Sequence, residues 1–177
     1  MQKKKRITVR VITTAAMLAA ISVLIGIFCK TFLQHPALIY YRITFENLPV
    51  ILSGLLFGPV VGAMVGVCAD LVSCLCSPYP AVNPVISLGA GMVGVMAGLT
   101  PYIIKKKGVL QNAVAVMLAH LVGQVLIKSI AKMIFFTMPW QGIFLGLAIS
   151  LGVGVVEFAV ISLLRSSRGI SRFLEGE

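Results

Sequence analysis

Long runs of apolar residues, separated by short polar segments, dominate the chain. Four runs have about the 20 residues that an α-helix needs to cross a bilayer. Their bounds are 7–28, 82–104, 109–136 and 141–164. A fifth apolar run, 47–76, is longer, and Gly58-Pro59 divides it near its middle. Because proline breaks the interior of a helix, this run and the residues just before it predict two shorter helices, 44–57 and 59–76.

The positive charges fix how often the chain crosses the membrane. Lysine and arginine cluster at residues 3–6, 105–107 and 165–172, and such clusters near membrane helices stay cytoplasmic. If the run 47–76 crosses twice, four crossings separate the first cluster from the second and two more reach the third. The sequence therefore predicts an all-α, polytopic membrane protein with six transmembrane helices and both termini cytoplasmic.

The composition supports this class. Of the 177 residues, 59% are hydrophobic and 11% are charged, whereas a soluble domain carries about 25% charged residues. The net charge of +10 would suggest nucleic acid binding in a soluble protein, but here it is confined to the ends and one loop. Residues 1–177 form one membrane domain, so any ATPase must be a separate protein. The apolar run continues through Phe28, beyond the about 7–15 residues of the apolar region of a signal peptide, which predicts an uncleaved first helix.

The helix 44–57 is short for a crossing. From Glu46 to Phe57 an α-helix would be about 18 Å long, whereas the hydrocarbon core is about 30 Å thick. Two alternatives stay open: the helix begins earlier, near Arg42, or it ends beside a water-filled cavity, as short helices in transporters do.

Small residues recur at four-residue spacing in three predicted helices. The glycines are Gly54, Gly58, Gly62, Gly66, Gly94 and Gly98. Such spacing lets membrane helices pack backbone to backbone, and it predicts contacts inside the bundle. The first helix has an alanine stripe: Ala15, Ala16, Ala19 and Ala20. The stripe either packs inside the bundle or accepts a helix of a partner protein.

Ionisable residues at membrane depth are costly, so they mark candidate functional sites. His120, Gln124, Lys128 and Lys132 recur every four residues and share one drifting helix face. In the predicted topology Lys128, Lys132 and Arg42 lie in the outer half, with Glu46 and Asp70 as anions. Lys128 either pairs with Asp70 while Lys132 reaches the interface, or the positive charge binds an anionic ligand. His120 is expected to be a hydrogen-bonded residue of the bundle.

Aromatic residues gather at the same outer mouth: Tyr40, Tyr41, Phe45, Tyr79 and Trp140. They form an interfacial belt or stack on a flat ring system.

Motifs for catalysis are absent from the sequence. It has no phosphate-binding loop, no Gly-x-Ser-x-Gly and no His-Glu-x-x-His. Its two histidines, His35 and His120, lie far apart, and its four cysteines suit small buried apolar side chains. We therefore expect no catalytic residue, no metal and no cofactor.

Several segments carry a family resemblance. The run 42–49, the Leu55–Gly62 stretch with its Phe57-Gly58-Pro59 turn, Asp70 and the connection 79–84 resemble substrate-binding S components of energy-coupling factor (ECF) vitamin transporters, most closely those of the folate family. The resemblance implies a six-helix protein of the bacterial cell membrane that binds a vitamin in its outer half. It implies partners, a T component and two ATPase subunits, with the alanine stripe docking on the T component and residues 29–42 acting as a lid.

The chemistry of folate fits the candidate residues. Asp70 and Asn83 suit the hydrogen-bonding edge of a pterin, and Lys128, Lys132 or Arg42 suits the carboxylates of the glutamate tail. Phe45, Tyr79 and Trp140 suit stacking on the rings. The candidate substrate-binding residues are Arg42, Phe45, Glu46, Asp70, Tyr79, Asn83, Lys128, Lys132 and Trp140.

Three alternatives remain. In the first, the protein is an S component for another vitamin, such as pantothenate or riboflavin. In the second, it is a self-contained ion-coupled carrier, although such carriers often show internal repeats and none is evident here. In the third, it is a membrane enzyme that uses Asp70 or Glu157, although it lacks a nucleophile–base pair.

Overall fold

The computed structural model describes residues 8–33, 43–76, 83–106, 108–136 and 140–167, and no β-strand occurs among them. In chain order the helices are α1 (Val9–Phe32), α2 (Asn47–Phe57), α3 (Pro59–Leu75), α4 (Pro84–Ile103), α5 (Val109–Leu118), η1 (Ala119–Lys128), α6 (Ser129–Phe136) and α7 (Gly142–Ser166). The segment η1 is a π-helix that continues α5 directly into α6. The prediction of an all-helical chain is confirmed for the residues that the structure describes.

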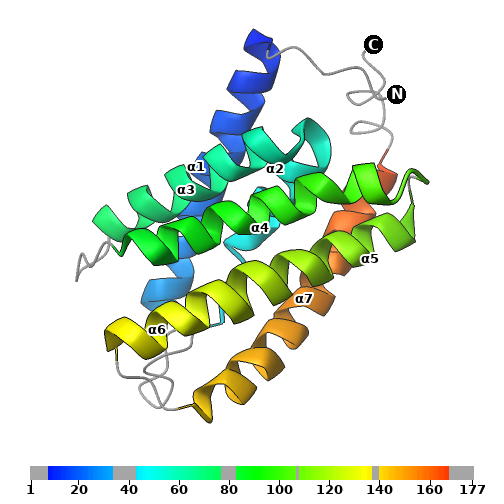
Figure 1. Ribbon diagram of the computed structural model, residues 1–177. Coiled ribbons are helices and arrows are strands. Elements are labelled where there is room, and N and C mark those ends of the chain that lie inside the picture. Colours follow the sequence, from blue (N-terminus) through cyan, green and yellow to red (C-terminus); the bar gives the residue numbers. More distant parts are fainter. Residues whose placement is uncertain (1–7, 34–42, 77–82, 107, 137–139, 168–177) are drawn as a thin grey trace.

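Helix α4 lies at the centre of the bundle (Figure 1). It packs against α2 and α3 and also against α5 and η1. Helix α1 packs on α2 and α3, and α7 packs on α5 and η1. The buried apolar core lies where these helices meet and includes Ile51, Val93, Ala115 and Ile161.

Glycines bring α2, α3 and α4 into backbone contact. A Cβ atom on Gly54 would lie 2.5 Å from the backbone oxygen of Gly94, and one on Gly62 would lie 2.6 Å from the same oxygen. A Cβ atom on Gly98 would collide with the backbone of Pro59. The prediction that these small residues serve contacts inside the bundle is confirmed.

A tight turn joins α2 to α3. Gly58 has φ 96° and ψ 178°, a backbone conformation that favours glycine, and its N–H donates to Gly54 O at 2.8 Å. Pro59 follows at the first position of α3, where its missing N–H costs nothing. The Gly-Pro pair thus ends one helix and starts the next, as the sequence predicts.

Helix α2 begins at Asn47, later than the predicted start at residue 44 and well after Arg42. The reason is local, because the Glu46 N–H donates to Thr44 Oγ1 at 3.2 Å and so holds the residues before the helix in a turn. Helix α1 continues to Phe32, beyond the predicted end at residue 28.

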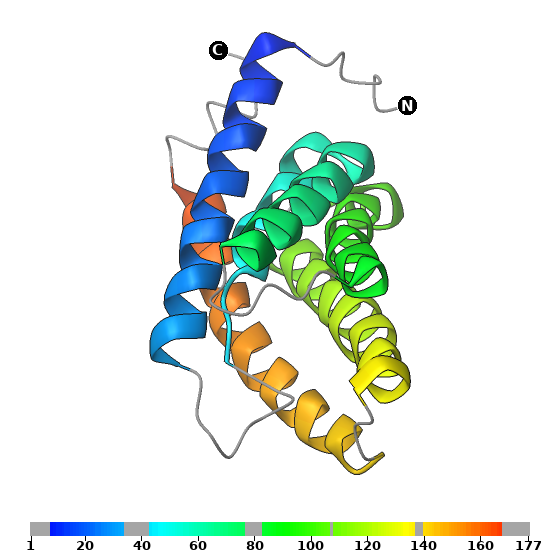
Figure 2. The same ribbon diagram turned by 90° about the vertical axis from the view of Figure 1, so that its left-hand side faces the viewer.

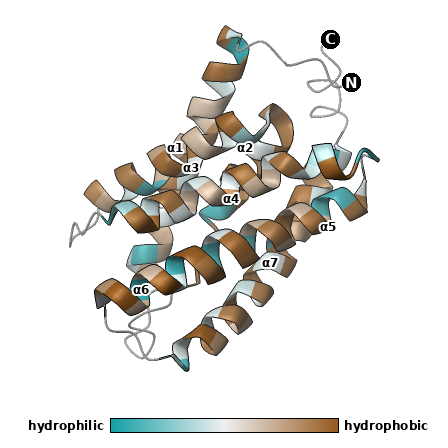
Figure 3. Cartoon of the chain, viewed as in Figure 1, coloured by the Kyte–Doolittle hydropathy of each residue, from teal (hydrophilic) through white to brown (hydrophobic). Residues whose placement is uncertain are grey.

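The outer surface of the bundle is apolar. Among the described residues, four helices are long and apolar enough to cross a membrane: α1, α4, the continuous helix Val109–Phe135 and α7. Helices α2 and α3 are apolar but shorter. Figure 3 shows hydrophobic residues along every helix, with hydrophilic residues concentrated near helix ends and on part of η1 and α6. Figure 2 shows that the N-terminal turns of α1 project beyond the neighbouring helices.

Candidate functional site

A polar cavity of about 100 Å³ lies inside this apolar bundle. Its walls come from the residues just before α2 and from α3, α4, η1, α6 and α7. The polar side chains that line it are Thr44, Glu46, Asp70, His120, Gln124, Lys128, Lys132 and Ser150. Charged residues inside a membrane bundle are costly and mark functional sites, so this cavity is the candidate site.

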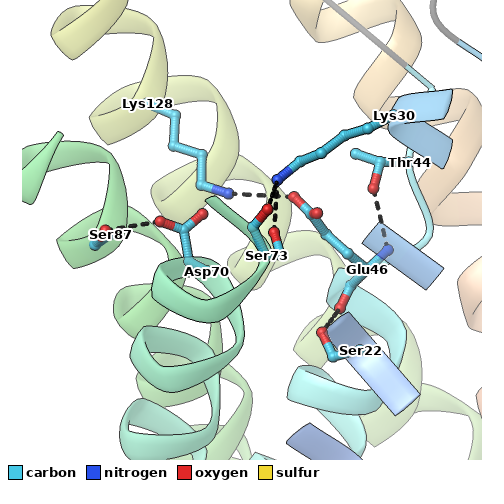
Figure 4. A network of polar contacts seen from close by, with 8 residues as sticks. All are labelled: Ser22, Lys30, Thr44, Glu46, Asp70, Ser73, Ser87 and Lys128. Atoms are coloured by element: carbon cyan, nitrogen blue, oxygen red, sulfur yellow. Dashed lines mark hydrogen bonds and ion pairs between the residues drawn. The ribbon is translucent and has the colours of Figure 1, made fainter. Parts of the chain in front are cut away.

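Lys128 and Glu46 face each other in this cavity (Figure 4). Lys128 Nζ lies 3.9 Å from Glu46 Oε1, and the two side chains are 8% and 14% exposed. At this distance the contact is an ion pair rather than a direct hydrogen bond. One interpretation of the sequence paired Lys128 with Asp70, but the ion pair of Lys128 is with Glu46.

Helix α1 fixes the position of Glu46. Ser22 Oγ donates to the backbone oxygen of Glu46 at 2.6 Å. A Cβ atom on Gly26 would lie 2.8 Å from Glu46 Oε2, so α1 leaves room for the carboxylate only because residue 26 is glycine. The position of the Glu46 carboxylate in the cavity therefore depends on how α1 packs against the start of α2.

Two further polar contacts tie helices together beside the cavity. Ser87 Oγ of α4 donates to Asp70 Oδ2 of α3 at 2.7 Å. Lys30 Nζ of α1 donates to Ser73 O at 2.9 Å and to Ser73 Oγ at 2.6 Å. Lys30, Ser73 and Ser87 were not among the predicted site residues. Their signal was weak, because a single serine in an apolar helix is common.

The four polar residues at four-residue spacing all line this cavity, which confirms that they share one face. An α-helix completes a turn in 3.6 residues, so residues four apart drift around its axis. The π-helix η1 has wider turns, because its hydrogen bonds run between residues five apart, and wider turns oppose that drift. The α and π turns together leave His120, Gln124, Lys128 and Lys132 on one wall of the cavity.

His120 forms a buried pair with Glu157. His120 Nε2 lies 2.7 Å from Glu157 Oε2, and the two residues are 6% and 0% exposed. The prediction that His120 is a hydrogen-bonded residue of the bundle is confirmed. The same imidazole also borders a second cavity of about 190 Å³ between α5, η1 and α7, which is lined mainly by apolar side chains.

The remaining predicted site residues lie away from the polar cavity or outside the described residues. Asn83 Oδ1 accepts from the Val85 N–H at 3.0 Å and so caps α4. Trp140 is 61% exposed, with its ring centroid 6.0 Å from that of Phe144. Phe45 is half-buried next to Glu46 and is not among the lining residues. Arg42 and Tyr79 lie outside the described residues.

The alanine stripe of α1 is divided between two environments. Ala15 and Ala19 pack partly buried against the apolar core, whereas Ala16 and Ala20 are exposed. The stripe thus presents part of its surface to the bundle and part to the outside.

The chemistry of the site is that of binding. The described residues hold no group of three histidine, cysteine, aspartate or glutamate side chains that could bind a metal ion. Cys29, Cys68, Cys74 and Cys76 form no disulfide, and Cys68 and Cys76 are exposed rather than buried as the sequence predicted. The cavity offers fixed charges and hydrogen-bonding groups of both signs, an arrangement that suits an ionic ligand with polar edges.

The family of the protein follows from its sequence. The sequence pattern of the ECF transporter substrate-specific component matches residues 10–165, which is most of the chain. The protein belongs to this family of substrate-specific components of ECF transporters. It is therefore a membrane component of a transporter, and its family is not one of enzymes. No curated protein shows a significant match to the chain in sequence.

The fold is similar to that of a solved member of this class. The crystal structure of FolT bound with folic acid matches with a TM-score of 0.74 and 18% sequence identity. The match covers 91% of this chain and 95% of the FolT chain. At this identity the likeness shows that the two proteins share a fold.

Proposed function

We propose that this chain captures a folate-type vitamin outside the cell and delivers it inward with a T component and two ATPase subunits. The observation that carries the proposal is the cavity in which Lys128 and Lys132 line an interior space. The shared fold with FolT, which was crystallised with folic acid, supports the choice of vitamin.

Each end of folate has a partner in the cavity. The glutamate tail carries two carboxylates, and Lys128 and Lys132 supply the charge-assisted hydrogen bonds that bind carboxylates most strongly. Asp70 is held in place by Ser87 and accepts hydrogen bonds from the pterin N–H groups. Arg42, Phe45, Tyr79, Asn83 and Trp140 stay predicted contacts of the vitamin on the basis of the sequence alone.

The cavity must widen to admit a vitamin. Its volume of about 100 Å³ is below the about 300 Å³ of a typical small-molecule site. The contact between Lys128 and Glu46 is the one to open, because at 3.9 Å it lacks the direct hydrogen bond that a ligand carboxylate would make. We therefore expect the ligand carboxylate to replace Glu46 beside Lys128.

We propose that the cavity lies in the outer half of the membrane. Six crossings with both termini cytoplasmic put Lys105 and Arg165 on the cytoplasmic side. The carboxyl end of α7 lies beside the start of α5, because Arg165 Nη1 donates a hydrogen bond to Asn112 Oδ1. The helix from Val109 then runs outward and carries Lys128 and Lys132 toward the medium. Helix α2, about 16 Å long at 11 residues, begins within the membrane beside the cavity.

Helix α1 provides the docking surface for the T component. Ala16 and Ala20 are exposed on it, and small residues at this spacing let a partner helix approach closely. Ala15 and Ala19 lie at the edge of the same surface, where it meets the bundle core.

Calorimetric titration of the purified protein with folic acid, riboflavin and pantothenate tests the proposal. Folic acid should bind at least about 100-fold more tightly than the other two, a difference of about 2.7 kcal/mol. Preference for riboflavin or pantothenate would replace folate by that vitamin. Uptake into vesicles that contain this chain alone, without ATP, would instead show a self-contained carrier.

A further inference from the structure

The imidazole of His120 has one edge against α7. Its Nε2 lies 2.7 Å from Glu157 Oε2, and a Cβ atom on Gly154 would lie 3.6 Å from its Cδ2. Because Cδ2 and Nε2 are bonded neighbours in the ring, this edge faces α7. Nδ1 lies on the opposite edge, away from both Gly154 and Glu157.

Nδ1 has no hydrogen-bond partner in the part of the chain that the structure describes, although His120 is only 6% exposed. A buried polar atom left unpaired costs free energy, and nearly all such atoms in proteins are paired. The ring borders the polar cavity and also the apolar cavity beside it. An atom in that space can therefore satisfy Nδ1.

The partnership with Glu157 decides whether Nδ1 donates or accepts. Glu157 is fully buried, and a net charge on the pair would be costly in the membrane interior. The pair has three neutral arrangements. The one in which Nε2–H donates to the carbonyl oxygen of the carboxylic acid leaves the acid O–H on Oε1 without a partner among the described residues, so two remain. In one, an imidazolium faces a carboxylate and both ring nitrogens carry hydrogen. In the other, the carboxylic acid donates to Nε2, so the single ring hydrogen sits on Nδ1. In both arrangements Nδ1 is a donor.

We propose that His120 is a further ligand-binding residue, which donates a hydrogen bond from Nδ1 to an acceptor atom of the vitamin, and that Glu157 is its positioning residue. The acceptor is a carbonyl oxygen or a ring nitrogen. His120 and Lys128 are two turns apart on the same wall, so the acceptor belongs to the part of the vitamin remote from the carboxylate at Lys128. This inference rests on the proposed binding of a vitamin in the cavity.

Two variants separate the roles of the two ring nitrogens. In His120→Asn the amide nitrogen is bonded to Cγ, as Nδ1 is, so the donor toward the cavity remains. In His120→Gln the amide reaches the position of Nε2, so the contact with Glu157 remains and the donor toward the cavity is lost. If Nδ1 binds the ligand, His120→Gln should weaken binding by about tenfold or more and His120→Asn by about threefold or less.

The variants are compared with whichever vitamin of the panel binds the wild-type protein most tightly. The reverse order, or equal losses, would show that His120 serves only its pair with Glu157 and would overturn the inference. Binding of riboflavin in place of folic acid would contradict the choice of folate and leave this comparison valid. Failure of the wild-type protein to bind any vitamin would overturn the proposed function and this inference together.

Nitrogen NMR of histidine-labelled protein gives a second readout that does not depend on the stability of a variant. Nδ1 of His120 should carry hydrogen in the ligand-free protein and should shift when the vitamin binds. An Nδ1 without hydrogen, or one that does not respond to a bound vitamin, would overturn the inference. The signal is assigned by its loss in His120→Gln, because His35 is the one other histidine.

The positioning role of Glu157 has its own test. Glu157→Leu should weaken binding by about tenfold in the wild-type background, because the imidazole loses the partner that orients it. In the His120→Asn background the same change should leave binding unaltered, since the asparagine donor does not use Glu157. An equal loss in both backgrounds would show a general structural effect and would remove Glu157 from the proposal.

Discussion

Gly89 of α4 lies directly against the side-chain stem of Lys128, because a Cβ atom on Gly89 would be 2.8 Å from Lys128 Cγ. The backbone oxygen of Gly123 would be 3.2 Å from that Cβ atom on Gly89. Gly89→Ala should therefore displace the ammonium group of Lys128 from the cavity. We expect the variant to lose about 1 kcal/mol or more of folic acid binding free energy, measured by calorimetry.

Gly152→Ala is the matched control, because a Cβ atom on Gly152 would meet nothing within 4 Å. It should bind folic acid as the wild-type protein does. The effect of Gly89→Ala should also vanish in a Lys128→Ala background, since the displaced group is then absent. Equal affinities of Gly89→Ala and the wild-type protein would show that Lys128 does not depend on this contact.

Lys128→Ala tests the cation itself. Because a charge-assisted hydrogen bond to a ligand carboxylate is strong, we expect folic acid to bind about tenfold more weakly or worse, a loss of about 1.4 kcal/mol. Lys106→Ala removes an equal charge from an exposed position in the α4–α5 connection and should leave the affinity unchanged. An unchanged affinity of Lys128→Ala would remove this residue from the site.

The sequence predicted the wall of the cavity well because that signal is local. Polar residues every four positions in an apolar helix share a face whatever surrounds them, so His120, Gln124, Lys128 and Lys132 were found together. Gly54 and Gly94 were also recognised from their spacing, although their contact lies between two helices. The π-helical turns within this wall have no comparable residue pattern in this sequence.

The partner of Lys128 was harder to predict, because it depends on contacts between distant segments. Glu46 reaches the cavity since Ser22 bonds its backbone oxygen and Gly26 leaves room for its carboxylate, and both residues come from α1. Asp70 is instead engaged by Ser87. Charges that lie at similar depth in a predicted topology thus leave their pairing open until helix packing is known.

The contact of α3 with α4 should be sensitive to one methyl group. A Cβ atom on Gly94 would collide with the backbone oxygen and carbonyl carbon of Gly62, and backbone cannot move aside as a flexible side chain can. Gly94→Ala should therefore destabilise the protein by about 1–3 kcal/mol, seen as a lower thermal unfolding temperature in detergent. Gly152→Ala is again the control, and a similar unfolding temperature for both variants would contradict this account of the packing.

Docking on the T component should depend on the exposed part of the alanine stripe. Ala16→Phe and Ala20→Phe should leave folic acid binding intact but prevent copurification with the T component and ATP-dependent uptake, because a large side chain blocks close helix approach. Ile21→Phe, about 100° around α1 from Ala20 and also exposed, should preserve the complex. Copurification of all three variants would place the docking surface elsewhere.

The sidedness of the membrane decides which end of the bundle receives the vitamin, and single cysteines can report it. The four native cysteines are first replaced by alanine, because Cys68 and Cys76 are exposed and would react. In this background Lys106→Cys should resist a membrane-impermeant thiol reagent in intact cells and react after the membrane is opened. Trp140→Cys, which is exposed at the start of the α7 segment, should react in intact cells. Labelling of Lys106→Cys from outside would show that the bundle has the opposite orientation. Lys128 and Lys132 would then lie toward the cytoplasm, where they would receive no vitamin from the medium.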